Sequence, residues 1–245
     1  MYLKTLIDVG LVRVFGRIKY ELRIFLDSKL PKRFILFLCN TGRNYPSLNK
    51  DFELLAISKF DKPNNNYSNK FSIEFNFLNQ KYTMDYPFDW NMKDRSRLWI
   101  FNLHYFDWAR ELIEQRIKNR VWSKDSYYLE KLLDNWIDNN PPGNGDGWHS
   151  YTISLRIRNW IWIFRFFPSL ISKKRINSLW EQICWLNAHT EDHLGGNHLI
   201  ENLTALIIGA SQFSNNKSRQ IFEQAILKLE FELDKQILDD GGHEE

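Results

Sequence analysis

The sequence predicts an all-α protein whose antiparallel helices form an incomplete (α/α) toroid, with a small β-hairpin in the N-terminal third. Two observations support this fold class. From residue 97 to residue 235, apolar residues recur at spacings of three and four, as in helices that bury one face. The strict alternation that is typical of strands is found within residues 71–77, so a second layer of sheet is not expected.

Asn, Pro and Gly residues divide the helical part into segments joined by short loops. The first apolar pattern covers residues 99–117 and includes Phe106 and Ala109 on one face. Short loops make consecutive helices pack antiparallel, which favours a curved helical array. The further helices are expected at residues 126–137, 150–167, 176–189, 198–213 and 218–237.

The N-terminal third has a different character. Residues 44–96 are rich in Asn, Pro, Lys and Asp and are expected to be loop, except for a hairpin of residues 71–77 and 81–84 that is an appendage to the helices. Residues 1–43 are basic and amphipathic, which indicates either a helix packed on its own domain or a helix on an anionic membrane surface or partner. The predicted domains are therefore 1–43, 44–96 and a toroid-like helical domain of 97–245.

Composition narrows the classes of function. The chain has 245 residues and a formal net charge of only +3, from interspersed basic and acidic residues, so a nucleic-acid partner is not expected. Charged residues interrupt the apolar stretches near the N-terminus, so we expect no signal peptide or transmembrane segment and a cytoplasmic location. Cys39 and Cys184 lie in apolar contexts and are expected to be buried, reduced thiols.

Residues 194–206 form the most informative segment. Two glycines precede a predicted helix, and Asn197 and His198 stand in its first turn, where unpaired backbone N–H groups and the helix dipole favour an anion. An amide and an imidazole at this place are suited to hold a carboxylate and to move a proton. The structural alternative is that Asn197 is an N-cap and that His198 lies on a partly buried face.

A second segment, residues 147–160, follows a Pro-Pro-Gly loop. His149 and Tyr151 come at the start of a predicted helix and are expected to face a cleft, and Trp160 is a further candidate for substrate binding. Arg156 and Arg158 are separated by about 200° around a helix, so they cannot both point at one ligand. One of the two is expected to bind a uronate, and the spacing does not distinguish which.

The sequence also contains residues that could form a metal site. His189 and His193 are four residues apart, which would place two imidazoles on one face of a helix, near Asp192 and His198. The glutamate of a zinc-protease motif is displaced by one residue, to Glu191, so a surface histidine pair is the preferred interpretation. The sequence predicts no metal and no cofactor.

Four segments in order, residues 99–106, 151–160, 196–202 and 240–243, resemble the successive signatures of heparinase II/III family proteins found with bacterial surface-polysaccharide genes. The resemblance implies an incomplete toroid followed by a β-sandwich, with an acidic polysaccharide bound in the groove between them. It also implies β-elimination, in which a uronate carboxylate is neutralised, the C5 proton is removed and the oxygen on C4 is protonated.

By position in these signatures, Asn197 corresponds to the amide that neutralises the carboxylate, His198 to the histidine that assists proton transfer and His243 to the histidine of an Asp-Gly-Gly-His turn. Asn202 is a further expected substrate contact. After His243 the family pattern continues to a Tyr-His pair, which contains the expected acid and base, whereas this sequence ends at Glu245. The resemblance therefore implies weak or no activity for this chain alone, which is either a truncated gene product or one part that works with a separately encoded β-sandwich portion.

Two other functions remain open at this stage. The first is a non-catalytic domain that binds acidic polysaccharide or serves as a scaffold. The second is a helical-toroid glycoside hydrolase that uses two carboxylates from Asp146, Glu191, Asp192 and Glu201. An assay for unsaturated uronates separates a lyase from both.

Overall fold

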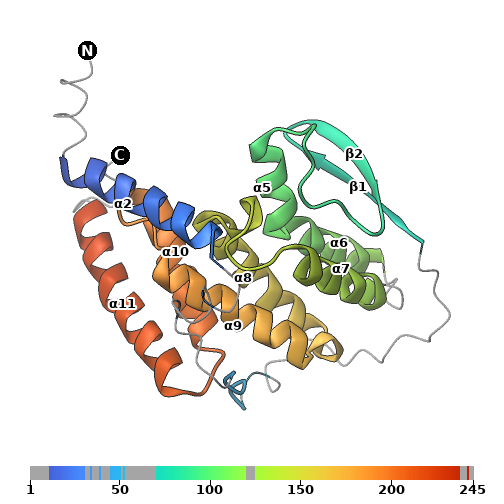
Figure 1. Ribbon diagram of the computed structural model, residues 1–245. Coiled ribbons are helices and arrows are strands. Elements are labelled where there is room, and N and C mark those ends of the chain that lie inside the picture. Colours follow the sequence, from blue (N-terminus) through green and yellow to red (C-terminus); the bar gives the residue numbers. More distant parts are fainter. Residues whose placement is uncertain are drawn as a thin grey trace.

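The computed structural model describes residues 11–30, 34, 39, 45–50, 52, 70–119, 125–237 and 242. These residues form a helical body with a two-stranded hairpin at one end and helix α2 (Leu11–Ser28) across the other (Figure 1). The predicted helical fold with a small hairpin is confirmed, and its curvature into a toroid stays a prediction. Among the residues described, no helix combines the length and the apolarity needed to cross a bilayer.

The predicted helices after residue 125 are all present, with ends that differ from the predicted ends by at most three residues. A short 3-10 helix, η1 (Asp146–Trp148), leads into α8, and a second, η2 (Pro168–Leu170), follows it. The α-helices are α5 (Arg97–Tyr105), α6 (Asp107–Asn119), α7 (Asp125–Asn139), α8 (Ser150–Phe166), α9 (Lys173–Ala188), α10 (Gly196–Ala210) and α11 (Asn216–Gln236).

The first predicted helix is in fact two helices, because the helical conformation is interrupted at Phe106. Phe106 has φ 65° and ψ 15°, the left-handed conformation, which costs a residue with a side chain about 1–2 kcal/mol. Its ring is fully buried and stacks on Trp90 at 5.6 Å. Burying a Phe ring contributes about 1.5–3 kcal/mol, so packing outweighs the backbone cost. The apolar spacing continues across the break, which is why the sequence pattern did not predict it.

The hairpin consists of β1 (Ser72–Phe77) and β2 (Gln80–Asp85), paired antiparallel. Its turn residues are Leu78 and Asn79, both with positive φ. Phe75 is buried on the hairpin's inner face, with its ring centroid 5.1 Å from that of Trp108 on α6. The expectation of an appendage is wrong, because the hairpin contributes to the same hydrophobic core as the helices.

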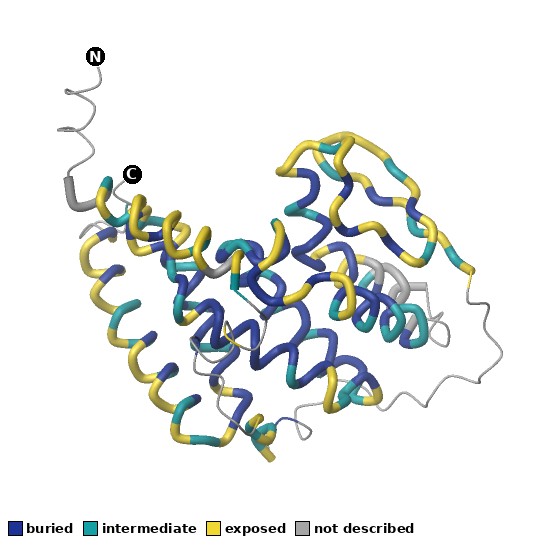
Figure 2. Tube along the Cα trace, in the orientation of Figure 1, coloured by how far each residue is buried: buried dark blue, intermediate teal, exposed yellow. Residues whose placement is uncertain are grey.

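Helix α8 lies in the middle of the body and contacts α5, α6, α9 and α10. Figure 2 shows that it is buried along most of its length. Neighbouring helices approach closely at Gly209 on α10, where an added Cβ would lie 2.9 Å from Cγ1 of Ile183 on α9 and 3.1 Å from Cγ2 of Ile157 on α8.

The two cysteines are both buried and are not joined in a disulfide, as predicted. Burial raises the pKa of the Cys184 thiol to about 12. The thiol therefore stays protonated at neutral pH and behaves as a small apolar group of the core.

Gly209→Ala is expected to lower the free energy of unfolding by about 1–3 kcal/mol, because overpacking against Ile157 and Ile183 outweighs the helix propensity of Ala. Denaturant unfolding measures the effect, and Glu223→Ala on the exposed surface of α11 is the control. A more stable Gly209→Ala protein would contradict the close approach of α8, α9 and α10.

Candidate functional site

The first turns of α8 and α10 lie side by side and carry the candidate site. The hydroxyl of Ser150, the first residue of α8, donates to the backbone oxygen of His189 at 2.6 Å, just past the end of α9. The Asn202 amide of α10 donates to the hydroxyl of Ser154 at 3.0 Å. The first bond holds the start of α8 against the loop between α9 and α10, and the second holds it against α10. We call His149, Tyr151, Glu191 and His198, which meet at this point, the His–Tyr–Glu cluster.

Glu191 is at the centre of the cluster and is 1% exposed. One of its carboxylate oxygens accepts a hydrogen bond from the Asn202 amide at 3.3 Å. Nδ1 of His198 lies 3.4 Å from the carboxylate, and Nε2 of His149 lies 3.9 Å from it. A buried carboxylate needs such partners, because its charge is costly to remove from water. Glu191 therefore connects two imidazoles that come from different helices.

Tyr151 packs directly on His198, with ring centroids 4.6 Å apart. Burial raises the pKa of Tyr151 above its usual 10, and the nearby carboxylate of Glu201 raises it further by a smaller amount. Tyr105 at the end of α5 lies behind it at 6.2 Å, and burial raises the pKa of that phenol to about 12. Tyr151 is therefore a protonated phenol at neutral pH and a potential proton donor beside an imidazole.

His149 links the cluster to a neighbouring pocket. Burial lowers the pKa of His149 below its usual 6.5, more than the nearby Glu191 raises it, so the ring is neutral at neutral pH. Its ring packs on Phe101 at 5.1 Å. Within the described part of the chain, Nδ1 of His149 is buried without a hydrogen-bond partner.

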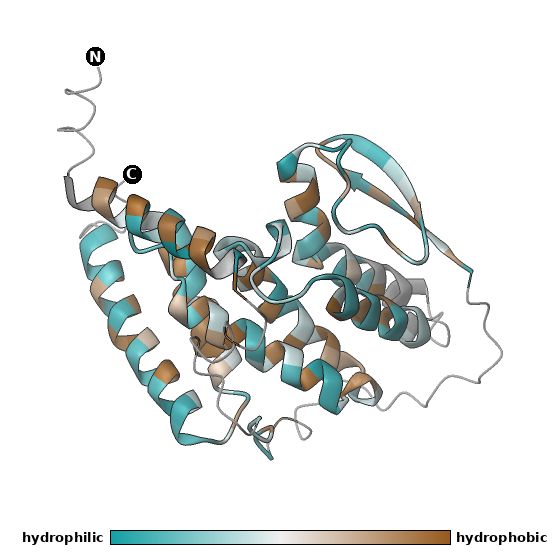
Figure 3. Ribbon diagram, in the orientation of Figure 1, coloured by the Kyte–Doolittle hydropathy of each residue, from teal (hydrophilic) through white to brown (hydrophobic). Residues whose placement is uncertain are grey.

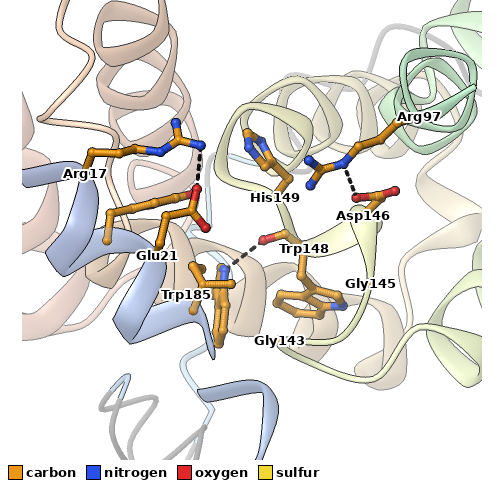
Figure 4. Close-up of a pocket in the computed structure, with 11 residues that line it drawn as sticks. Arg17, Glu21, Arg97, Gly143, Gly145, Asp146, Trp148, His149 and Trp185 are labelled. Carbon is orange, nitrogen blue, oxygen red and sulfur yellow. Dashed lines mark hydrogen bonds and ion pairs between the residues drawn. The ribbon is translucent and has the colours of Figure 1, made fainter. Parts of the chain in front are cut away.

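The pocket beside His149 has a volume of about 260 Å³. Figure 4 shows two arginines on opposite sides of it, Arg17 from α2 and Arg97 from α5. Each is paired with a carboxylate, Arg17 with Glu21 and Arg97 with Asp146 at 2.7 Å. Trp148 and Trp185 form its floor. The lining thus combines aromatic surface with polar groups, as sugar-binding pockets do.

Asn197 and His198 stand where the sequence predicted them, in the first turn of α10. Gly195 and Gly196 have positive φ values of 63° and 52°, so the chain turns sharply just before this turn. Gly195 is the N-cap and makes no side-chain cap bond, which rules out the alternative that Asn197 is simply an N-cap. Asn197 is exposed and the His198 side chain is 46% exposed. Both are accessible to a ligand.

Three residues that the sequence predicts to contact the substrate are instead buried. Arg156, Trp160 and Asn202 each have no exposed surface. Arg156 donates to Gln182 at 2.8 Å and to the backbone oxygen of His104, and Trp160 packs against Phe106 at 5.6 Å. These residues were assigned to the groove because they lie near its signatures in sequence, but helix geometry turns them inward. They support the packing around the site, and none of the three presents an exposed surface.

Arg158 is the arginine that reaches the surface, since its side chain is 37% exposed and is paired with Glu201. His149 and Tyr151 are both partly exposed. These three residues remain candidates for substrate binding. His243, the third predicted catalytic residue, lies outside the described residues.

His189 and His193 do not form the expected surface pair, because both side chains are buried. His189 lies just beyond the end of α9, and its ring stacks on Trp185 with 3.9 Å between centroids. His193 packs on Tyr20 at 4.7 Å, and Asp192 pairs with Lys228. Across the described residues there is no group of three or more His, Cys, Asp or Glu that could hold a metal ion.

Two features of the site were missed by sequence reasoning. Glu191 had been considered as a metal neighbour or a hydrolase carboxylate, whereas its position between His149 and His198 indicates an orienting role. The contribution of α2 to the pocket had no sequence signal, because Arg17 and Tyr20 lie far along the chain from the motifs.

Residues 33–245, most of the chain, match the family described as Heparinase II/III N-terminus. No curated protein and no solved structure matches the chain.

Arg156→Ala is expected to lower the free energy of unfolding by about 3 kcal/mol, because it leaves a cavity and two buried oxygens without their donor. Arg158→Ala, at a partly exposed ion pair two residues away, should cost less than about 1 kcal/mol. Denaturant unfolding of both variants tests this contrast, and equal losses would contradict the supporting role of Arg156.

Proposed function

Because this chain belongs to the heparinase II/III N-terminus family, we propose that it is the helical domain of a polysaccharide lyase. The proposed substrate is a uronate-containing polysaccharide, cleaved by β-elimination in the metabolism of surface polysaccharides. The observation that carries the proposal is the contact of Tyr151 with His198, at 4.6 Å, over the buried carboxylate of Glu191.

The first requirement of β-elimination is a more acidic C5–H bond. A carboxylate beside C5 carries negative charge, so removing the proton requires donors aimed at the charge that develops on the carboxylate oxygens. Asn197 stands exposed in the first turn of α10, where the helix dipole is positive. Its amide and the neighbouring backbone N–H groups are the donors that the proposal assigns to this step.

The second requirement is a base for the C5 proton and an acid for the oxygen on C4. In the proposal, the unprotonated ring of His198 takes the proton as the C5–H bond breaks. The electron pair forms the C4–C5 double bond, the C4–O bond breaks, and the leaving oxygen takes the proton of the Tyr151 hydroxyl. The raised pKa of Tyr151 favours this role, because the phenol is protonated before the reaction.

Glu191 supports the pair as a positioning residue. It lies 3.4 Å from Nδ1 of His198, which leaves Nε2 as the ring nitrogen that can face a substrate. The carboxylate accepts a hydrogen bond from the Asn202 amide at 3.3 Å, and the backbone N–H of Glu191 donates to Oδ1 of Asn202 at 2.9 Å. In many enzymes a general base is oriented by a neighbouring group, and in the proposal Glu191 orients His198 in this way.

The proposal also includes the partner that the resemblance implies. A β-sandwich portion, on the same or a separate chain, would form the second wall of the groove. The partly exposed residues His149, Tyr151 and Arg158 are the contacts that this chain would offer to an acidic polysaccharide. A helical domain that binds such a polysaccharide without cleaving it is the alternative function.

His198→Ala and Tyr151→Phe are each expected to lower kcat at least about 100-fold, because each removes a proton-transfer group. The assay follows the ultraviolet absorbance of unsaturated uronates, with a panel of uronate-containing polysaccharides and the β-sandwich portion added where one is identified. Tyr128→Phe on α7, a half-buried tyrosine that packs on Phe71, is the matched control and should leave kcat unchanged.

Three results of this assay would contradict the proposal. Reducing ends released without ultraviolet absorbance would indicate a hydrolase. Binding without turnover when the β-sandwich portion is present would indicate the non-catalytic function. Turnover that survives His198→Ala would exclude His198 as the base.

A further inference from the structure

Helix α2 turns its most apolar face away from the protein. Phe15, Ile18, Leu22 and Leu26 are 67%, 56%, 54% and 52% exposed, and Phe25 beside them is 58% exposed. Their spacing of three and four residues places them in one stripe along the helix. Figure 3 shows this apolar surface along α2, and Figure 2 shows that it is exposed. Helices on globular domains ordinarily bury such a stripe.

The opposite face of α2 fixes this orientation. Gly16 lies so close to His193 that an added Cβ would be 2.8 Å from the Cβ of that histidine. Tyr20 is buried, and its hydroxyl is 2.9 Å from that of Ser150. Because Ser150 gives its proton to the backbone oxygen of His189, the Tyr20 hydroxyl donates in this bond. The helix is thus seated through a small residue and a hydrogen bond, and rotation to bury the stripe would break both.

Positive charge accompanies the apolar stripe. Residues 11–30 contain five basic and two acidic residues. Lys19 and Arg23 are exposed along one border of the stripe, and Lys29 lies over the Phe25 ring at its end. A large apolar stripe with basic residues at its border is the pattern of helices that lie in the headgroup region of a bilayer.

We propose that α2 is an interfacial helix that binds this protein to an anionic lipid bilayer. The apolar stripe would enter the boundary between headgroups and acyl chains, and Lys19 and Arg23 would contact the anionic headgroups. A second copy of the chain suits this face less well, because two α2 helices would bring their basic borders together. The inference stands independently of the proposed lyase chemistry, and α2 lies outside the residues that match the family.

The seating of α2 also places the candidate site near the lipid surface. Arg17 and Glu21 of α2 line the pocket beside His149, on the side of the helix turned toward the protein. A helix with its side chains is about 10–12 Å across. Docking through the apolar stripe would therefore hold this pocket about one helix diameter from the bilayer, in reach of a saccharide chain attached there.

Cosedimentation of the full chain with vesicles tests the proposal. The protein is expected to bind vesicles that mix phosphatidylglycerol with phosphatidylcholine and to bind phosphatidylcholine vesicles more weakly. Ile18→Ser with Leu22→Ser should lower the partition coefficient at least about tenfold, because less apolar surface is buried. Lys19→Gln should lower it about fivefold on the anionic vesicles and leave it unchanged on neutral ones.

The matched control is Leu227→Ser with Phe231→Ser, which removes two equally exposed apolar side chains from α11. It should bind vesicles as the unchanged protein does, and both double variants should keep the circular dichroism spectrum. Failure of the unchanged protein to bind anionic vesicles would overturn the proposal, as would an equal loss in the α11 variant. Self-association abolished by the α2 variant, without vesicle binding, would assign the face to a second copy instead.

Discussion

The buried guanidinium of Arg156 is the interaction on which the arrangement of the helices depends. Arg156 belongs to α8, stacks over the ring of Trp136 on α7 at 4.0 Å, and donates to Gln182 on α9 and to the backbone oxygen of His104 on α5. Burying a cation is costly, and burial lowers the pKa of Arg156 well below its usual value. Planar stacking and donation in several directions offset that cost in a way that a lysine would not. One side chain therefore holds four helices in register.

The candidate site depends on this register. Burial lowers the pKa of His104 to about 3, with a smaller effect from the charge of Arg156, and its neutral ring accepts a hydrogen bond from the indole of Trp136 at 2.9 Å. This bond fixes the end of α5 to α7, and the bond from Arg156 to the His104 backbone oxygen fixes it to the middle of α8. Tyr151, one and a half turns before Arg156, is carried to a defined place beside His198. Accurate placement of a proton donor and an acceptor thus comes from packing several residues away from either group.

The sequence allowed the helices after residue 125 to be predicted well, because each has a periodic apolar face and a polar or glycine boundary. It did not predict the break at Phe106, where the apolar spacing continues and only tertiary packing of the ring distinguishes two helices from one. Asn197 and His198 were found through the glycines before them. Tyr151 was singled out as well, but its contact with His198 joins two helices and has no local signature. Arg156 and Arg158 could not be told apart until burial was known.

The two faces of α2 have separate consequences. On the inner face, the Tyr20 hydroxyl donates a hydrogen bond to Ser150, and Ser150 in turn donates to the backbone oxygen of His189. These bonds connect α2 to the loop that carries Glu191. The outer face carries the apolar stripe and makes none of these contacts. Because the faces lie on opposite sides of one helix, a bilayer could cover the outer face while the inner hydrogen bonds and the His–Tyr–Glu cluster stay unchanged. The protein could therefore bind a bilayer and carry out chemistry at the His–Tyr–Glu cluster with α2 in the same position. A substitution that abolishes one of these functions need not abolish the other.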